Sequence, residues 1–299
     1  MENQVPEDGI IKQIAKLIDQ IETSGSTLTS IKSIVTGILG IINSPDSSPN
    51  DLKELIEIDP PLAAKVLRVA NSPYYASHRT ISDIDQAIIW IGFDALQEIV
   101  LTQKFSEIFK NGTESYGFSL EALWRHSLAV ALLSKIIYRR EYGEKGNNAY
   151  AAGLLHDIGI IVEEQFRHDQ FKKILKAYHE SGNNITKAEK DILGFDHAQL
   201  GKTLADHWNF PLELVTAIGC HHNPDKAEQE HVRLASTLYV ADFLVLKNNL
   251  GFCDAGVNDS KKFAEIAKSL KLTTFSIKAL LAVLLEDLEK MEDKGGFIK

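Results

Sequence analysis

The sequence is poor in cysteine, with only Cys220 and Cys253 among its 299 residues. The two lie far apart and form no Cys-x-x-Cys pair, so the composition argues against a disulfide framework and against a thiolate zinc site. We therefore expect two reduced thiols in a cytosolic protein.

Long apolar runs are also missing. The longest, over residues 31–42, is interrupted by Lys32, Ser33, Thr36 and two glycines, so no segment has the length of a membrane span. The first nine residues are polar and acidic, unlike the positive and then apolar pattern of a signal peptide. We expect no membrane partner.

Positive charge is scarce as well. Lysine and arginine number 32 against 41 aspartates and glutamates, which gives a net charge of −9. A nucleic-acid binder needs a positive face to meet the phosphate backbone. The charge balance therefore argues against nucleic acid as a partner.

Apolar residues are plentiful, at 44% of the chain, and recur at helical spacing. No stretch alternates with the period of two that marks a strand, so we predict an all-α fold. The polar loop formers at 111–117 mark the best boundary. They predict an N-terminal helical subdomain at 1–115 and a second helical domain, with the C-terminal helices, at 116–299.

The most informative stretch runs from Ala151 to Ile160, where His156 and Asp157 interrupt an apolar sequence. We expect the helix that carries them to stop or kink at Gly159. Burying a carboxylate demands a cation or several donors. A divalent metal meets that demand, and a hydrogen-bonded His-Asp pair is the alternative.

Further histidines and acids follow the same pattern of polar side chains in apolar helices. Asp242 is the most telling, because aspartate is a poor interior helix former and its neighbours here are apolar or aromatic. Helices packed side by side would point all these groups into one cavity. The predicted ligand set is His126, His156, Asp157, His197, His221, His222 and Asp242.

Seven ligand groups exceed what one ion uses, so the set implies two divalent ions that share a carboxylate, for which Asp157 is best placed. Such a site suits the hydrolysis of a phosphate ester. Imidazole and carboxylate leave the metal open among Fe, Mn, Ni, Zn and Mg. Arg125, beside His126, and Lys202, near His197, are candidates for binding the phosphate.

At these residues the chain resembles the HD superfamily of metal-dependent phosphohydrolases. Its N-terminal half resembles the HDOD branch, the "HD-related output domain", through IDPPLAAKVLRVANSPYY at 58–75 and ISDIDQAIIWIGF at 81–93. The resemblance implies a helical subdomain packed on an HD-like helical domain. It also implies a bacterial signalling or regulatory module.

Residue by residue, the resemblance places His126, His156, Asp157 and Asp242 at the basic HD ligand positions. His197, His221 and His222 match the additional histidines of the two-metal HD-GYP relatives.

The chain also departs from active HD-GYP enzymes. No Gly-Tyr-Pro motif follows His222, and Ile160 and Ala122 stand where a lysine and a glutamate are often found. These departures weaken the case for cyclic-di-GMP hydrolysis and leave metal binding intact.

Three functions remain open. The first is a signalling module that keeps a metal site with little turnover and meets a signalling protein or a phosphorylated small ligand. The second is an active phosphohydrolase or phosphodiesterase, with Asp157 as the catalytic residue. The third is a metal-free scaffold that uses the Pro73-Tyr74-Tyr75 turn as an aromatic anchor, and local core packing is the simpler explanation of that turn.

Overall fold

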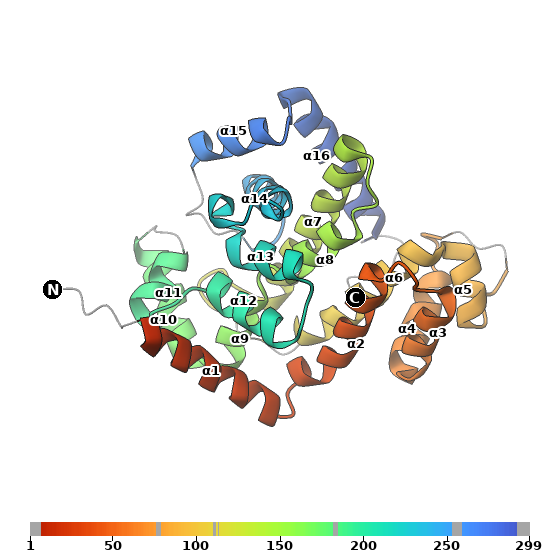
Figure 1. Cartoon of the computed structure of the whole chain (residues 1–299), viewed down its shortest axis with the longest axis horizontal. Coiled ribbons are helices and arrows are strands. Elements are labelled where there is room, and N and C mark those ends of the chain that lie inside the picture. Colours follow the sequence, from red (N-terminus) through yellow and green to blue (C-terminus); the bar gives the residue numbers. More distant parts are fainter. Residues whose placement is uncertain are drawn as a thin grey trace.

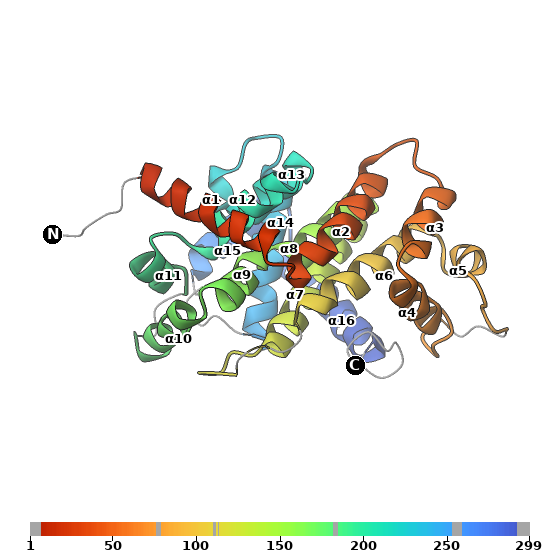
Figure 2. The same ribbon diagram turned by 90° about the horizontal axis from the view of Figure 1, so that it is seen from below.

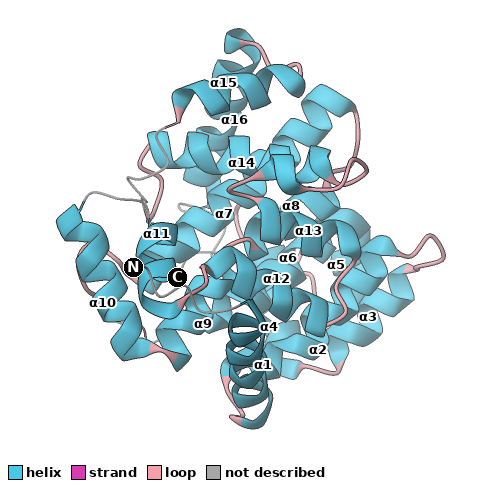
Figure 3. Cartoon of the chain, turned by 60° about the vertical axis from the view of Figure 1, so that its left-hand side comes forward, coloured by secondary structure: helices cyan, strands magenta, loops and turns pink. Residues whose placement is uncertain are grey.

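The computed structural model describes residues 7–75, 79–109, 112, 114–181, 185–252 and 259–291. Within these ranges the fold is all-α, as predicted (Figure 3). The single strand-like contact is an isolated bridge between Ser115 and Phe118. Cys253 lies outside the described residues.

The helices before the predicted boundary loop follow the apolar periodicity of the sequence. They are α1 (Glu7–Thr23), α2 (Thr27–Asn43), α3 (Pro49–Glu57), α4 (Pro60–Ala70), α5 (Ile84–Ile91) and α6 (Phe93–Phe105). At the start of α4, Asp59 accepts a hydrogen bond from the backbone N–H of Leu62, and two prolines occupy the first turn.

The helices after the loop carry the candidate site. They are α7 (Leu120–Ile137), α8 (Asn147–Leu155), α9 (Ile158–Phe166), α10 (His168–Ser181), α11 (Ile185–Leu193), α12 (His197–His207), α13 (Leu212–Cys220), α14 (Val232–Lys247), α15 (Ser260–Ser269) and α16 (Thr274–Lys290). A π-helical turn, Tyr138–Tyr142, extends α7.

The two ends of the molecule are formed by different parts of the chain. Helices α3, α4 and α5 group at one end and α10 and α11 at the other, with α7, α8 and α14 between them (Figures 1 and 2). Helix α6 packs on both α2 and α8, so it joins the N-terminal helices to the rest.

Buried apolar residues form one continuous cluster that reaches from Ile14 in α1 to Met291 after α16. The predicted boundary therefore does not separate two apolar cores. Asn111 and Thr113 of that boundary lie outside the described residues, and the division at residue 115 stays a prediction.

The Pro73-Tyr74-Tyr75 turn does not project into solvent as an aromatic anchor. Tyr74 and Tyr75 are half-buried against the core, with their rings edge to face and 4.9 Å apart. The indole N–H of Trp90 donates to the Tyr75 carbonyl. Local packing accounts for the pair.

No single helix in the described ranges is long and apolar enough to cross a membrane. Only α1 and α2 taken together reach that length and composition, and they are bent by 92° at the break between them.

Candidate metal centre

The His156-Asp157 pair lies at the break between α8, which ends at Leu155, and α9, which begins at Ile158. The predicted stop or kink at Gly159 lies instead at His156-Asp157, and α9 runs through Gly159. A Cβ there would lie within 2.8 Å of the backbone of His197, so glycine allows α9 to approach the start of α12. Gly153 plays the same part in α8, against the backbone of Ala131 in α7.

His197 is the first residue of α12, and its position is set by a capping box. Asp196 accepts from the backbone N–H of Gln199, whose side chain returns a bond to the backbone of Asp196. The Lys190 ammonium lies 2.6 Å from the Asp196 carboxylate. Nε2 of His197 lies 3.4 Å from Oδ1 of Asp157.

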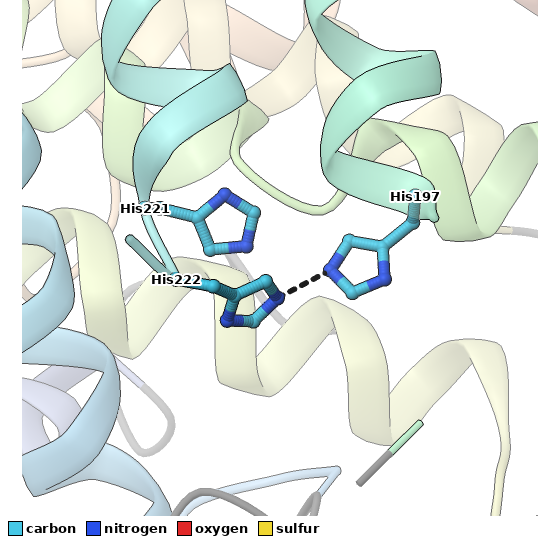
Figure 4. Close-up of side chains that lie close together, drawn as sticks. All are labelled: His197, His221 and His222. Atoms are coloured by element: carbon cyan, nitrogen blue, oxygen red, sulfur yellow. Dashed lines mark hydrogen bonds between the residues drawn. The ribbon is translucent and has the colours of Figure 1, made fainter. Parts of the chain in front are cut away.

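The end of α13 supplies His221 and His222. Figure 4 shows both rings close to that of His197, with Nε2 of His222 and Nε2 of His197 2.8 Å apart. Nδ1 of His221 donates to the carbonyl of Ile218 at 2.6 Å, which turns its Nε2 inward.

Helices α7 and α14 close the site from the other side. Nε2 of His126 lies 3.2 Å from Oδ1 of Asp242 and 3.3 Å from Nε2 of His156. Asp242 is only 4% exposed although it sits in the middle of a helix. The buried aspartate that the sequence singled out therefore does have polar partners, and they come from other helices.

Asp157 stands between the two groups of histidines. Its Oδ2 lies 3.1 Å from Nε2 of His156 and 3.6 Å from Nε2 of His126. Its Oδ1 lies 3.4 and 3.7 Å from Nε2 of His197 and His221. One carboxylate thus presents a separate oxygen to each group.

The charges of the cluster are strongly coupled. Burial opposes the charge on Asp157, but His156, His197 and His126 outweigh it and hold the pKa of Asp157 well below its usual range. Burial also opposes a proton on His156, yet Asp157 outweighs it and raises the pKa of His156.

In the group formed by His197, His221 and His222, the pKa values shift in opposite directions. Burial lowers the pKa of His221 to about 4 and the pKa of His222 well below the ordinary value. At His197, burial is outweighed by Glu189 and then Asp157, so its pKa is raised well above the ordinary value. His221 and His222 are thus neutral imidazoles, the form that binds metals.

The donor set fits divalent metal ions. Two sets of three ligand atoms each lie within 4.8 Å of one another, namely His126, His156 and Asp157, and His197, His221 and His222. Nε2 of His221 is buried and makes no hydrogen bond, which leaves a lone pair free for an ion. Imidazole nitrogen and carboxylate oxygen suit Zn, Fe, Mn or Ni.

The cavity beside these ligands is small, at about 20 Å³. That is room for about one water molecule. Apolar side chains form its remaining wall, namely Ile160, Ile185, Leu246 and Phe252.

The structure brings all seven predicted ligand residues into one cluster, and their binding of a metal stays a prediction. The two predicted phosphate contacts are placed differently: Arg125 and Lys202 are exposed, and neither lines the cavity. The Lys202 stem packs instead beside Gly219 of α13.

Two buried carboxyl groups next to the site were missed by the sequence reasoning. Glu189 in α11 and Glu163 in α9 have no exposed surface, and Glu189 contacts His197 at 2.8 Å. Glu163 directly follows the apolar residues Ile161 and Val162, and this position at the end of an apolar run could have indicated that its side chain is buried. Glu189 lies in a polar segment, so its sequence context does not indicate burial.

Comparison with known protein families matches residues 28–224 to the HDOD domain. The matched segment includes six of the seven clustered residues and ends before Asp242. An HDOD domain protein of unknown function from Geobacter sulfurreducens has the same fold, with a TM-score of 0.77 and 28% identity. The match covers 95% of this chain and 98% of that one.

Curated relatives share shorter or more distant stretches. An uncharacterized protein of Treponema pallidum is 24% identical over 237 residues, which are 78% of this chain and 45% of that protein. Ribonuclease Y of Thermus thermophilus is 32% identical over 114 residues, which are 38% of this chain and 14% of that enzyme. The chain therefore spans less than half the length of these curated relatives.

Proposed function

The chain belongs to the HDOD domain family, and from that premise we propose that it is a signalling module whose buried HD-type site holds divalent metal with little turnover. Its partner would be a signalling protein or a phosphorylated small ligand. The carrying observation is the contrast between a complete set of seven ligand residues and a cavity of about 20 Å³.

The size of the cavity supports binding over turnover. A nucleotide needs several hundred cubic ångströms, and Ile160 and Phe252 stand where a substrate would meet the ligands. Among the residues that the structure describes, that wall offers no lysine or arginine to a phosphate. The described site is therefore suited to small, buried ions.

The test is elemental analysis of purified protein, with His156→Ala beside the wild type and His179→Ala as the control. His156 is 1% exposed inside the cluster, whereas His179 is an exposed histidine of α10. We expect about two ions per chain in the wild type and in His179→Ala, since seven ligand groups exceed the needs of one ion, and fewer in His156→Ala. Metal-free wild-type protein would favour a scaffold instead.

The same preparations decide the question of turnover. We expect background rates on a panel of phosphomonoesters, nucleotides, cyclic dinucleotides and RNA, the last included because one relative is named as a ribonuclease. Rapid metal-dependent hydrolysis of any of these would refute the proposal of little turnover.

A second function, that of a metal-dependent phosphohydrolase, is favoured by the two-sided contacts of Asp157. Bound divalent ions would lower the pKa of water and hold phosphoryl oxygens. Asp157 would hold both ions in register, and the buried histidines would keep bulk water away. If this function is correct, Asp157→Ala abolishes hydrolysis, and an unchanged rate rules out the catalytic role.

A further inference from the structure

Both ring nitrogens of His197 lie close to carboxylates: Nε2 faces Asp157 in the site, and Nδ1 faces Glu189 on the opposite side of the ring. Nδ1 of His197 lies 2.8 and 2.9 Å from the two oxygens of Glu189, and its backbone N–H donates to one of them at 2.9 Å. Glu189 is fully buried. Because a carboxylate accepts but does not donate, Nδ1 carries the hydrogen and Nε2 is left to face the site.

Behind Glu189 lies a second buried acid, Glu163. Within the described part of the chain, neither oxygen of Glu163 has a hydrogen-bond donor beside it. Burial and the negative charge of Glu189 raise the pKa of Glu163 well above its ordinary value. Both effects favour the uncharged form of Glu163 beside Glu189.

The other ring nitrogens have weaker anchors. Nδ1 of His156 donates to the carbonyl of Gly153 at 2.8 Å, and His221 uses the carbonyl of Ile218 in the same way. Nδ1 of His126 is buried without a hydrogen-bond partner. Among the described residues, His197 is the one of these four histidines whose Nδ1 meets a carboxylate.

We infer that Glu189, backed by Glu163, is a positioning group that fixes His197 with Nε2 toward Asp157, and that it makes the half formed by His197, His221 and His222 the tighter metal position. This inference rests on the proposed metal site. A carboxylate on the outer nitrogen orients the ring and raises its basicity as a ligand, and such partners are commonly worth about 10- to 100-fold in metal affinity.

The test is a Zn²⁺ titration of the metal-free full chain against a chromophoric chelator, which resolves the two binding steps. Glu189→Gln removes one of the two acceptor oxygens, so either Nδ1–H or the backbone N–H of His197 loses its partner. We expect the tighter zinc step to weaken by about 10- to 100-fold while the weaker step stays within about two-fold of the wild type.

One control variant separates positioning from general stability. Glu164→Gln alters the neighbouring buried acid of α9, which lies beside His168. It is expected to keep the two zinc affinities, while melting temperatures without metal report any loss of stability.

The outcomes distinguish the two proposals. Two unchanged zinc steps in folded Glu189→Gln overturn this inference alone. A wild-type chain that binds no zinc overturns the metal site and this inference with it. If Glu189→Gln does not fold, Glu189→Asp serves instead, because its side chain is shorter by one methylene and its carboxylate lies farther from His197. The same loss of zinc affinity in one binding step is expected. Unchanged steps in that variant overturn the inference equally.

Discussion

Gly159→Ala tests whether the approach of α9 to α12 assembles the site. The added Cβ would lie 2.7 Å from the carbonyl carbon of His197 and 2.8 Å from its Cα, and closer still to its carbonyl oxygen. Ordinary van der Waals contact begins at 3.4 Å. Because the obstacle is backbone, the start of α12 has to move, and His197 moves with it.

The cost of Gly159→Ala follows from these contacts. Overpacking a core costs typically about 1–3 kcal/mol, and a backbone obstacle places this case near the upper end. Alanine returns up to about 1 kcal/mol of helix propensity. We therefore expect a net loss of about 2 kcal/mol, or roughly 4 °C in melting temperature for a chain of this length.

The matched control is Gly40→Ala in α2, where a Cβ meets no atom within 4 Å. There only the propensity gain remains, so we expect a stabilisation of about 0.5–1 kcal/mol. Thermal unfolding monitored by circular dichroism measures both variants, and zinc titration follows the displacement of His197. A Gly159→Ala protein as stable as Gly40→Ala, with wild-type zinc affinity, would refute the reasoning.

Three further changes test other parts of the structure. Asp242→Asn removes the charge beside the first group of histidines and should lower the metal content seen by elemental analysis. An unchanged content would show that Asp242 is not a ligand. Lys104 forms ion pairs with Asp59 and Glu107, and lysine contacts lower the pKa values of both carboxyl groups against the effect of burial. Lys104→Met removes these ion pairs and should lower the free energy of unfolding by about 1–2 kcal/mol at pH 7. Carboxyl groups with lowered pKa values stabilise the fold above about pH 4, and this stabilisation is lost as the pH falls. The destabilisation by Lys104→Met, measured by urea unfolding, should therefore be smaller at pH 3 than at pH 7. An equal destabilisation at both pH values would contradict this explanation. Phe252→Ala opens the apolar wall at a cost of about 3 kcal/mol, and the metal-loaded variant should hydrolyse bis(p-nitrophenyl) phosphate above the wild-type rate. A folded variant that stays at background would mean that this wall does not limit turnover.

The candidate ligands were accessible to sequence reasoning because each is a polar group in a context that buries it. Asp242 among apolar neighbours and His156-Asp157 in an apolar run need partners whatever the fold. Their shared place in consecutive helices, together with the HDOD resemblance, was enough to predict one cluster. The existence of the helices is also a local property, because it follows from the spacing of apolar residues, and it was predicted for the same reason.

Other features depend on which helices meet, and no local pattern encodes that. Gly159 was expected to end or kink a helix, yet the break lies at His156-Asp157, and the lack of a Cβ at Gly159 allows α9 to contact His197 of α12. Glu189 lies in an ordinary polar stretch, and only the packing of α11 against the start of α12 buries it. Lys202 was judged near the site by sequence spacing, but its side chain lies along α13.

The sequence by itself thus determined an all-α chain and the side chains that cannot be buried without polar partners, because burial and helix formation are set by the residues and their close neighbours. Only the tertiary structure decided that both oxygens of Asp157 are used, that acids support His197 from behind, and that the cavity is small. Those properties arise from distances between helices, and such distances are set by side-chain volumes packed from distant parts of the chain.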